Sequence, residues 1–119
     1  RYKLIFINCA VLCIILTIVK ITEYIEESFF SSLRRLNVEH VYGYLLHRPS
    51  QLLTNSGFEI YQAISNLKAQ GYIKKIGASI YQPDELDEIF KGYDLDLIQV
   101  PFNIFDRRLI ETGWLSLLQ

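Results

Sequence analysis

Three short strand-like runs rich in apolar residues, separated by helix-like stretches, limit what this chain of 119 residues can fold into more than any other feature. The runs cover residues 41–47, 72–80 and 95–100. The first ends shortly before Pro49 and the third ends at Pro101, and proline stops a central strand because it has no N–H group to donate. No Asn-Gly or Asp-Gly turn joins neighbouring runs into a hairpin. Short buried strands that alternate with helices are typical of an α/β protein with parallel strands and right-handed crossovers.

The clearest amphipathic helix pattern covers residues 22–36. Phe29 and Leu33 belong to an apolar face that repeats at helical spacing. Thr22 suits the N-cap position, and Asn37 suits the left-handed residue that ends a helix. We therefore expect a helix that begins at Thr22 and stops before Asn37.

Similar signals predict three further helices. Ser56 and Glu59 have the spacing of a capping box, and Gly71 suits the end of the helix that they begin. Pro83 fits the first turn of the next helix. Trp114 opens a last helix-like run near the end of the chain.

The resulting order, with helices alternating with three parallel strands, is that of the middle of a (β/α)8 barrel. A complete barrel needs about 250 residues, and three strands cannot close one. The chain begins with Arg1 rather than methionine and ends at Gln119 inside an apolar run. We therefore expect residues 21–119 to form part of a TIM barrel, as an internal fragment of a longer protein.

Residues 1–20 form a separate apolar segment. Residues 4–19 carry no charge and lie between Lys3 and Lys20. As a helix this stretch reaches about 24 Å, which is close to the ~30 Å thickness of a bilayer core. The alternatives are a transmembrane or signal-anchor helix, a cleaved signal peptide, and buried strand material from a truncated domain. The segment could also be a non-native start of the chain. The absence of a small-residue cleavage site disfavours the signal peptide, and an apolar helix is the favoured interpretation. The protein is accordingly expected in the cytoplasm, or anchored to a membrane if residues 4–19 span it.

Charge and cysteine content exclude several classes of function. The net charge is −1 and there is no basic block, so a nucleic-acid partner is not expected. Cys9 and Cys13 do not make a disulfide framework, and no histidine or acidic residue lies beside them. We interpret them as apolar filler and expect no metal site.

Each predicted strand ends in polar residues. His47 follows the first strand, Ser79 ends the second, and Gln99 and Asn103 follow the third. In a parallel sheet these positions meet at one rim, where β/α barrels place their chemistry. No phosphate-binding glycine motif or nucleophile elbow is present, so the rim suits a neutral amide or carbonyl ligand. The structural alternative is that such side chains only satisfy nearby backbone groups.

Four segments together resemble one known family. They read Ser-Leu-Arg-Arg-Leu at 32–36, Leu-Leu-His-Arg-Pro at 45–49, Ile-Lys-Lys-Ile-Gly-Ala-Ser at 73–79 and Ile-Gln-Val-Pro-Phe-Asn at 98–103. In this order and spacing, residues 22–119 resemble the aldo-keto reductases. The resemblance implies a (β/α)8 barrel that reduces aldehydes or ketones with NADPH.

The resemblance also implies roles for the strand-end residues. His47 is similar to the histidine that orients and polarises the substrate carbonyl. Ser79 and Gln99 fall where the family holds the nicotinamide carboxamide of NADP(H), and Asn103 lies just beyond in the same loop. The implied partners are a small carbonyl substrate and the cofactor.

Several positions depart from the family pattern. Ile80 stands where the family usually has asparagine, and Tyr42 stands where it often has aspartate. The family's catalytic tyrosine and lysine come from earlier strands, which residues 1–19 do not resemble, although Lys20 lies near the expected place of the lysine. The strands that hold the cofactor phosphates would follow Gln119. Activity of this chain alone is therefore not expected, and the alternative is a non-catalytic, membrane-tethered remnant of such a reductase.

Overall fold

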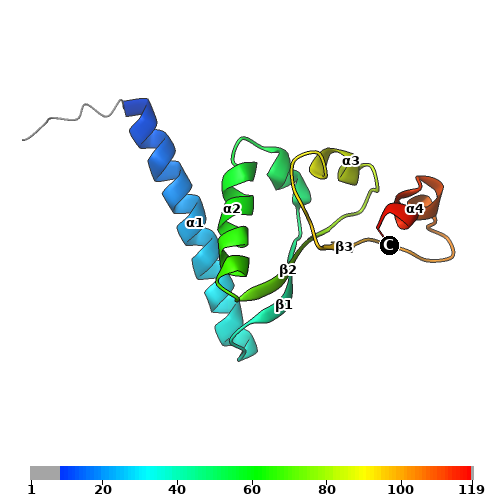
Figure 1. The fold of residues 1–119 in the computed structure, drawn as a ribbon, viewed down its shortest axis with the longest axis horizontal. Coiled ribbons are helices and arrows are strands. Elements are labelled where there is room, and N and C mark those ends of the chain that lie inside the picture. The colour runs from blue at the N-terminus through cyan, green and yellow to red at the C-terminus, as the bar shows by residue number, and fades with distance from the viewer. Residues whose placement is uncertain (1–8, 119) are drawn as a thin grey trace, which may run out of the picture.

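The computed structural model describes residues 9–118, and side chains from residue 17 onward. Helices and strands alternate along the described chain, as the sequence predicts (Figure 1). The elements are α1 (Cys9–Leu36), β1 (Val41–Leu46), the short 3-10 helix η1 (Pro49–Leu53), α2 (Gly57–Ala69), β2 (Ile73–Ser79), α3 (Glu85–Ile89), β3 (Leu97–Gln99), α4 (Arg108–Glu111) and α5 (Trp114–Leu117).

The three strands form one parallel sheet in the order β1-β2-β3. Leu46 of β1 lies opposite Ala78 of β2, and Ser79 at the end of β2 lies opposite Gln99 at the end of β3. All three strands therefore end at the same edge of the sheet. The predicted α/β architecture with three parallel strands and alternating helices is confirmed.

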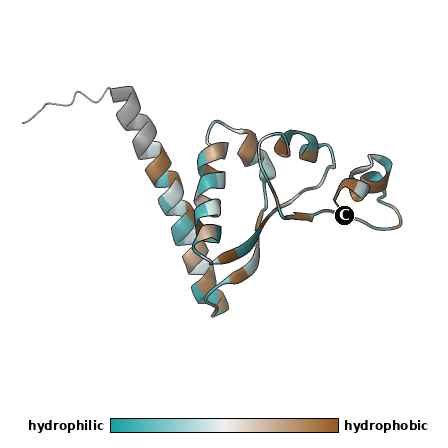
Figure 2. Cartoon of the chain, in the orientation of Figure 1, coloured by the Kyte–Doolittle hydropathy of each residue, from teal (hydrophilic) through white to brown (hydrophobic). Residues whose placement is uncertain are grey.

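The main core lies between the sheet and the two longest helices. It combines buried apolar side chains of α1, α2, β1 and β2, among them Phe29, Leu33, Leu46, Ile64, Leu67 and Ile76. Figure 2 shows α2 banded in hydrophobic and hydrophilic residues, as expected of a helix that buries one face. The helices thereby cover one face of the sheet.

Strand alternation sends the remaining side chains to the opposite face of the sheet. Tyr44 packs edge-on against Phe29 of α1, with ring centroids 5.4 Å apart, so the even-numbered residues of β1 face the helices. Gly77 of β2 and its partner Leu97 of β3 are odd-numbered and lie on the opposite face of the sheet, away from these helices. A Cβ atom on Gly77 would lie 2.5 Å from the carbonyl oxygen of Leu97, so only glycine lets β2 and β3 approach this closely. Ser79 and Gln99 extend the same face toward the carboxyl edge.

The first helix differs from its prediction. Helix α1 runs without interruption from Cys9 to Leu36, so Thr22 lies inside it and does not act as the N-cap. Nothing before Thr22 breaks the helix, and the apolar stretch and the amphipathic stretch therefore merge. Its end is as predicted, because Asn37 has a positive φ of 54°. Residues 4–8 of the predicted membrane segment lie outside the described residues. Within residues 9–118, no helix is both long and apolar enough to cross a bilayer.

The later helices also start differently from the prediction. The side chain of Ser56 makes no capping hydrogen bond to α2, so the predicted capping box with Glu59 is wrong. Gly71 does follow the helix with a positive φ of 86°. Helix α3 begins at Glu85, slightly later than Pro83 suggested, and the short helix α4 has no counterpart among the predicted elements.

Candidate functional site

The ends of the three strands bring the predicted polar residues into a row. His47 directly follows β1, Ser79 is the last residue of β2 and Gln99 is the last residue of β3. Because β2 is the central strand, Ser79 lies between the other two positions. Neighbouring strands are about 4.8 Å apart, so the row is about 10 Å across.

The side chains in this row are available for a ligand. His47 and Gln99 are exposed, and Ser79 is half-buried. Within the described part of the chain, none of the three side chains makes a hydrogen bond. The backbone holds the row together, since the N–H of Ile80 donates to the carbonyl oxygen of Gln99 at 2.8 Å. The row therefore presents an imidazole, a hydroxyl and an amide on a fixed backbone.

Asn103 is placed differently from the other three predicted residues. It lies in the loop after β3, where its Oδ1 accepts hydrogen bonds from the N–H groups of Phe105 at 2.9 Å and Asp106 at 3.1 Å. An asparagine oxygen that bonds the backbone two residues later forms a local turn. In this structure the Asn103 oxygen thus shapes the loop, and only its amide nitrogen stays available.

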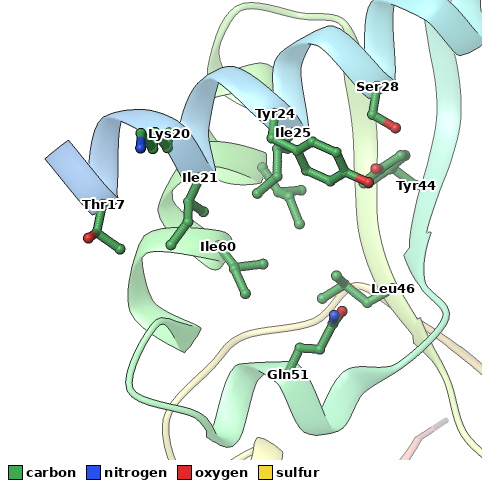
Figure 3. A pocket seen from close by; sticks show the side chains of 11 residues that line it. Thr17, Lys20, Ile21, Tyr24, Ile25, Ser28, Tyr44, Leu46, Gln51 and Ile60 are labelled. Carbon is green, nitrogen blue, oxygen red and sulfur yellow. The ribbon is translucent and has the colours of Figure 1, made fainter.

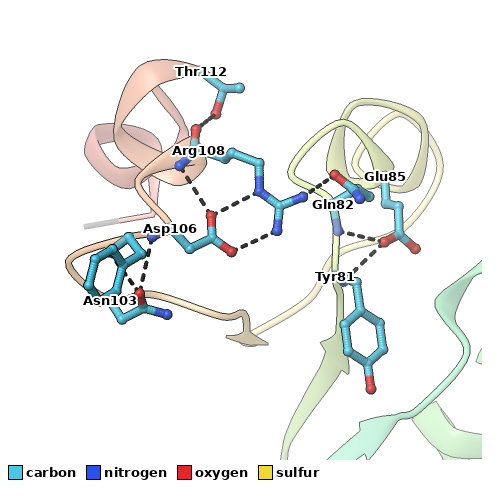
Figure 4. A network of polar contacts seen from close by, with 8 residues as sticks. Tyr81, Gln82, Glu85, Asn103, Asp106, Arg108 and Thr112 are labelled. Atoms are coloured by element: carbon cyan, nitrogen blue, oxygen red, sulfur yellow. Dashed lines mark hydrogen bonds and ion pairs between the residues drawn. The ribbon is translucent and has the colours of Figure 1, made fainter.

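An arginine network beside this loop was not predicted from the sequence (Figure 4). Arg108 donates from Nε to Oδ1 of Asp106 at 2.8 Å and from Nη2 to Oδ2 at 2.7 Å. Its Nη1 donates to Oε1 of Gln82, in the loop after β2. The Arg108 hydrogen bonds hold the pKa of the Asp106 carboxyl below its usual range. The only sequence signal was an aspartate two residues before an arginine, which is too common to indicate a network.

A second charged group lies at the opposite end of β3. Oδ2 of Asp96 accepts hydrogen bonds from Nζ of Lys68 at 2.6 Å and from the N–H of Ile76 at 2.8 Å. These bonds, with the nearby charge of Lys75 at 3.6 Å, lower the pKa of Asp96. Because Asp96 directly precedes β3, this cluster joins α2 and β2 to the start of β3, at the opposite end of that strand from Gln99.

A cavity lies on the helix-covered side of the sheet (Figure 3). It has a volume of about 480 Å³ and is lined mainly by apolar side chains of α1, α2 and β1, including Tyr44 and Leu46. Burial raises the pKa of the Tyr44 phenol. Lys20 lies at this cavity, inside α1 and not at a strand end. His47, Ser79 and Gln99 do not line the cavity, so it is separate from the candidate site.

Metal binding has no support in the described residues, where no group of three or more histidine, cysteine or acidic side chains could hold an ion. The side chains of Cys9 and Cys13 lie outside that description. The groups gathered at the strand ends are the hydrogen-bonding side chains of His47, Ser79 and Gln99.

Comparison with known proteins gives a consistent result. Residues 20–119 match the Aldo/keto reductase family. An uncharacterized oxidoreductase of Bacillus subtilis is 33% identical over 96 residues, covering 81% of this chain and 30% of that protein. An NADH-specific methylglyoxal reductase of Escherichia coli is 32% identical over 89 residues, covering 73% of this chain and 27% of that protein.

Solved structures agree with the sequence matches. An aldo-keto reductase of Bacillus halodurans, known in apo and holo forms, superposes with a TM-score of 0.69 at 32% identity. The match covers 82% of this chain and 33% of that structure. The chain thus spans about a third of the length of the proteins it matches, and its sheet corresponds to part of their barrel.

Proposed function

The chain belongs to the aldo/keto reductase family. We propose that the row of strand-end residues His47, Ser79 and Gln99 takes part in the NADP-dependent reduction of an aldehyde or ketone. The family relationship supports oxidoreductase chemistry with a nicotinamide cofactor. The specific cofactor, the residue roles and the activity of the whole protein are parts of the proposal.

The register of two strand ends is the observation that carries this proposal. Ser79 and Gln99 lie directly opposite each other and face the same side of the sheet. A nicotinamide carboxamide is a neutral amide with one acceptor oxygen and a donor NH2 group. A serine hydroxyl and a glutamine amide can each donate and accept, so together they match both ends of the carboxamide. Two contacts of this kind orient the nicotinamide ring, and the cofactor supplies the hydride.

His47 is suited to the substrate rather than to the cofactor. It follows the neighbouring strand β1 and its imidazole is exposed at the rim. A neutral imidazole can donate a hydrogen bond to the oxygen of a carbonyl group, on which negative charge develops during reduction. Its proposed role is to orient and polarise the substrate carbonyl beside the cofactor.

Two other positions have smaller parts in the proposal. Ile80 replaces the asparagine that the family usually has, and it is buried in a cluster with Ala78 and Leu86. It therefore packs on the helix side of the sheet and does not contact the carboxamide, which Ser79 and Gln99 would bind. Asn103 contributes by shaping the loop after β3, with only its amide nitrogen available to the cofactor.

The test is carbonyl reduction by the full natural protein and its His47→Ala variant, measured with NADPH and, separately, with NADH across a panel of small aldehydes. We expect a loss of about 10²- to 10⁴-fold in kcat/KM, because the variant lacks the group that stabilises the developing oxyanion. The matched control is His40→Ala, since His40 is exposed before the opposite end of β1. Turnover of His47→Ala within twofold of the His40→Ala control would contradict the assignment.

A further inference from the structure

The two loops that border the strand-end row are tied together by one arginine. We infer that Arg108 is a positioning residue, which holds the loop after β2 and the loop after β3 together and so keeps Ser79 and Gln99 ready for the carboxamide. The inference rests on the proposed function of that pair. The β2 loop is defined as residues 80–84 and the β3 loop as residues 100–107.

The guanidinium group of Arg108 serves both loops at once. Two of its nitrogens donate to the carboxylate of Asp106 in the β3 loop, at 2.7 and 2.8 Å. A third nitrogen donates to Oε1 of Gln82 in the β2 loop. A planar guanidinium has five donors in a fixed fork, so it can bind a carboxylate with one edge and a second acceptor with another. A lysine ammonium has no such geometry.

Both partners of the arginine are themselves held in place (Figure 4). Oε1 of Glu85 accepts hydrogen bonds from the N–H groups of Tyr81 at 3.1 Å and Gln82 at 2.9 Å, which fixes the β2 loop at the start of α3. On the other side, Oδ1 of Asn103 accepts from the N–H of Asp106 at 3.1 Å. The arginine therefore joins two ordered turns.

This connection matters because β3 is short. Its pairing with β2 ends at Gln99, whose carbonyl oxygen accepts from the N–H of Ile80 at 2.8 Å. In the part of the chain that the structure describes, the bond from Arg108 to Gln82 is the one side-chain hydrogen bond that joins the two loops. Without it, the Gln99 side chain and the β3 loop would sample other arrangements. The cofactor would then bind only those molecules in which the two loops are correctly arranged. The apparent affinity for the cofactor would fall in proportion to the fraction of such molecules.

Variants at Arg108 should still fold, since other contacts anchor the chain after the β3 loop. Leu109 is 4% exposed, and Trp114 stacks on Phe90, which directly follows α3, with ring centroids 5.5 Å apart. The Asp106 carboxylate, which would lose its partner, is 22% exposed at its side chain and so remains in contact with water.

The test uses four variants of the full natural protein. Arg108→Gln removes the guanidinium, and Gln82→Leu removes only its acceptor in the β2 loop. Arg107→Gln is the matched control, because this neighbouring arginine is exposed and its side chain makes no hydrogen bond within the described residues. Gln82→Glu is the rescue variant, since it keeps an acceptor oxygen for the arginine.

Two measurements are made on each variant. Steady-state kinetics gives KM for NADPH and kcat with one aldehyde, and hydrogen–deuterium exchange follows the amides of the β2 and β3 loops. We expect Arg108→Gln and Gln82→Leu to raise KM for NADPH roughly tenfold and to change kcat less than about threefold, because the bound state is unchanged once formed. Both variants should exchange faster in the two loops. Arg107→Gln and Gln82→Glu should stay within about twofold of the wild type in both parameters.

Two results would overturn the inference, and they are distinguishable from each other. Faster loop exchange with an unchanged KM would show that Arg108 orders the loops without positioning the cofactor site, while the proposed function would stand. If the wild-type protein itself showed no NADPH or NADH binding, the proposed function would fail and the positioning role with it.

Discussion

Asp96 offers the sharpest test of how the sheet is held together, because it forms hydrogen bonds with both the N–H and the carbonyl oxygen of Ile76 in the central strand β2. Its N–H donates to the carbonyl oxygen of Ile76 at 2.7 Å, and its carboxylate accepts from the N–H of Ile76 at 2.8 Å. The same carboxylate accepts from Nζ of Lys68 on α2 at 2.6 Å. Replacing Asp96 with alanine removes the second and third of these bonds and leaves an N–H group of β2 unpaired.

The size of the loss follows from the exposure of each partner. A hydrogen bond from a partly buried amide to a charged carboxylate contributes about 2 kcal/mol. The Lys68 pair is 38% and 23% exposed at its two side chains, so solvent screening limits it to about 1 kcal/mol. We expect Asp96→Ala to lower the free energy of unfolding by about 3 kcal/mol. Asp96→Asn keeps an acceptor for Ile76 but no charge, and should lose about 2 kcal/mol.

Acid should remove the same stabilisation from the wild type. The pKa of Asp96 is lowered in the folded state, chiefly by the hydrogen bond from Lys68. Its contribution is therefore fully present above the unfolded-state pKa of about 3.9, and it is lost as the pH falls through the lower folded-state value. Asp96→Asn should abolish this component, so its stability should fall less steeply as the pH drops below about 4.

Urea unfolding followed by far-UV circular dichroism at several pH values measures these differences. The matched control is Asp94→Asn, because Asp94 is exposed and makes no side-chain hydrogen bond in the described chain; we expect a change below about 0.5 kcal/mol. Equal stabilities of Asp96→Ala and Asp94→Asn, or an unchanged acid dependence in Asp96→Asn, would refute the reasoning.

Two further substitutions test the packing around the site. Gly77→Ala should lower the free energy of unfolding by about 1–3 kcal/mol, because the added Cβ would lie 2.5 Å from the carbonyl oxygen of Leu97 and 2.8 Å from the Cβ of Leu97. The control is Gly92→Ala, whose added Cβ would meet no atom within 4 Å. Equal urea midpoints for the two variants would contradict the prediction. Tyr93→Phe removes the 2.8 Å hydrogen bond from the phenol to the carbonyl oxygen of Leu52 and should lower the urea-derived stability by about 1 kcal/mol. An unchanged midpoint in that variant would show that water replaces the phenol at this carbonyl.

The strands and their edge can be predicted from the sequence because local signals agree there. Each strand combines an apolar run with a polar or proline stop, and the parallel arrangement follows from the helices between them. Helix ends are harder to predict. A cap at Thr22 is worth only about 1 kcal/mol, which does not interrupt a helix when the preceding residues also favour it. Likewise, the residue type of Ser56 suits a cap, but its side chain makes no capping bond in the fold.

The candidate site divides in the same way. Ser79 and Gln99 can be predicted because strand register alone places them together. The turn at Asn103 and the contact between Arg108 and Gln82 depend on how two loops far apart in the sequence meet, which periodicity does not encode. The family resemblance identifies residues similar to a known site, whereas the arginine connection emerges only from the arranged loops.

The most direct test of the central claim is the affinity of the full natural protein for two ligands, NADP⁺ and 2′-phospho-ADP-ribose, which lacks the nicotinamide. If Ser79 and Gln99 hold the carboxamide, the Gln99→Leu variant should bind NADP⁺ roughly tenfold more weakly, the equivalent of about 1.4 kcal/mol. Its affinity for 2′-phospho-ADP-ribose should stay within about twofold of the wild type. Equal losses for both ligands, or no loss for either, would contradict the claim that this pair recognises the nicotinamide.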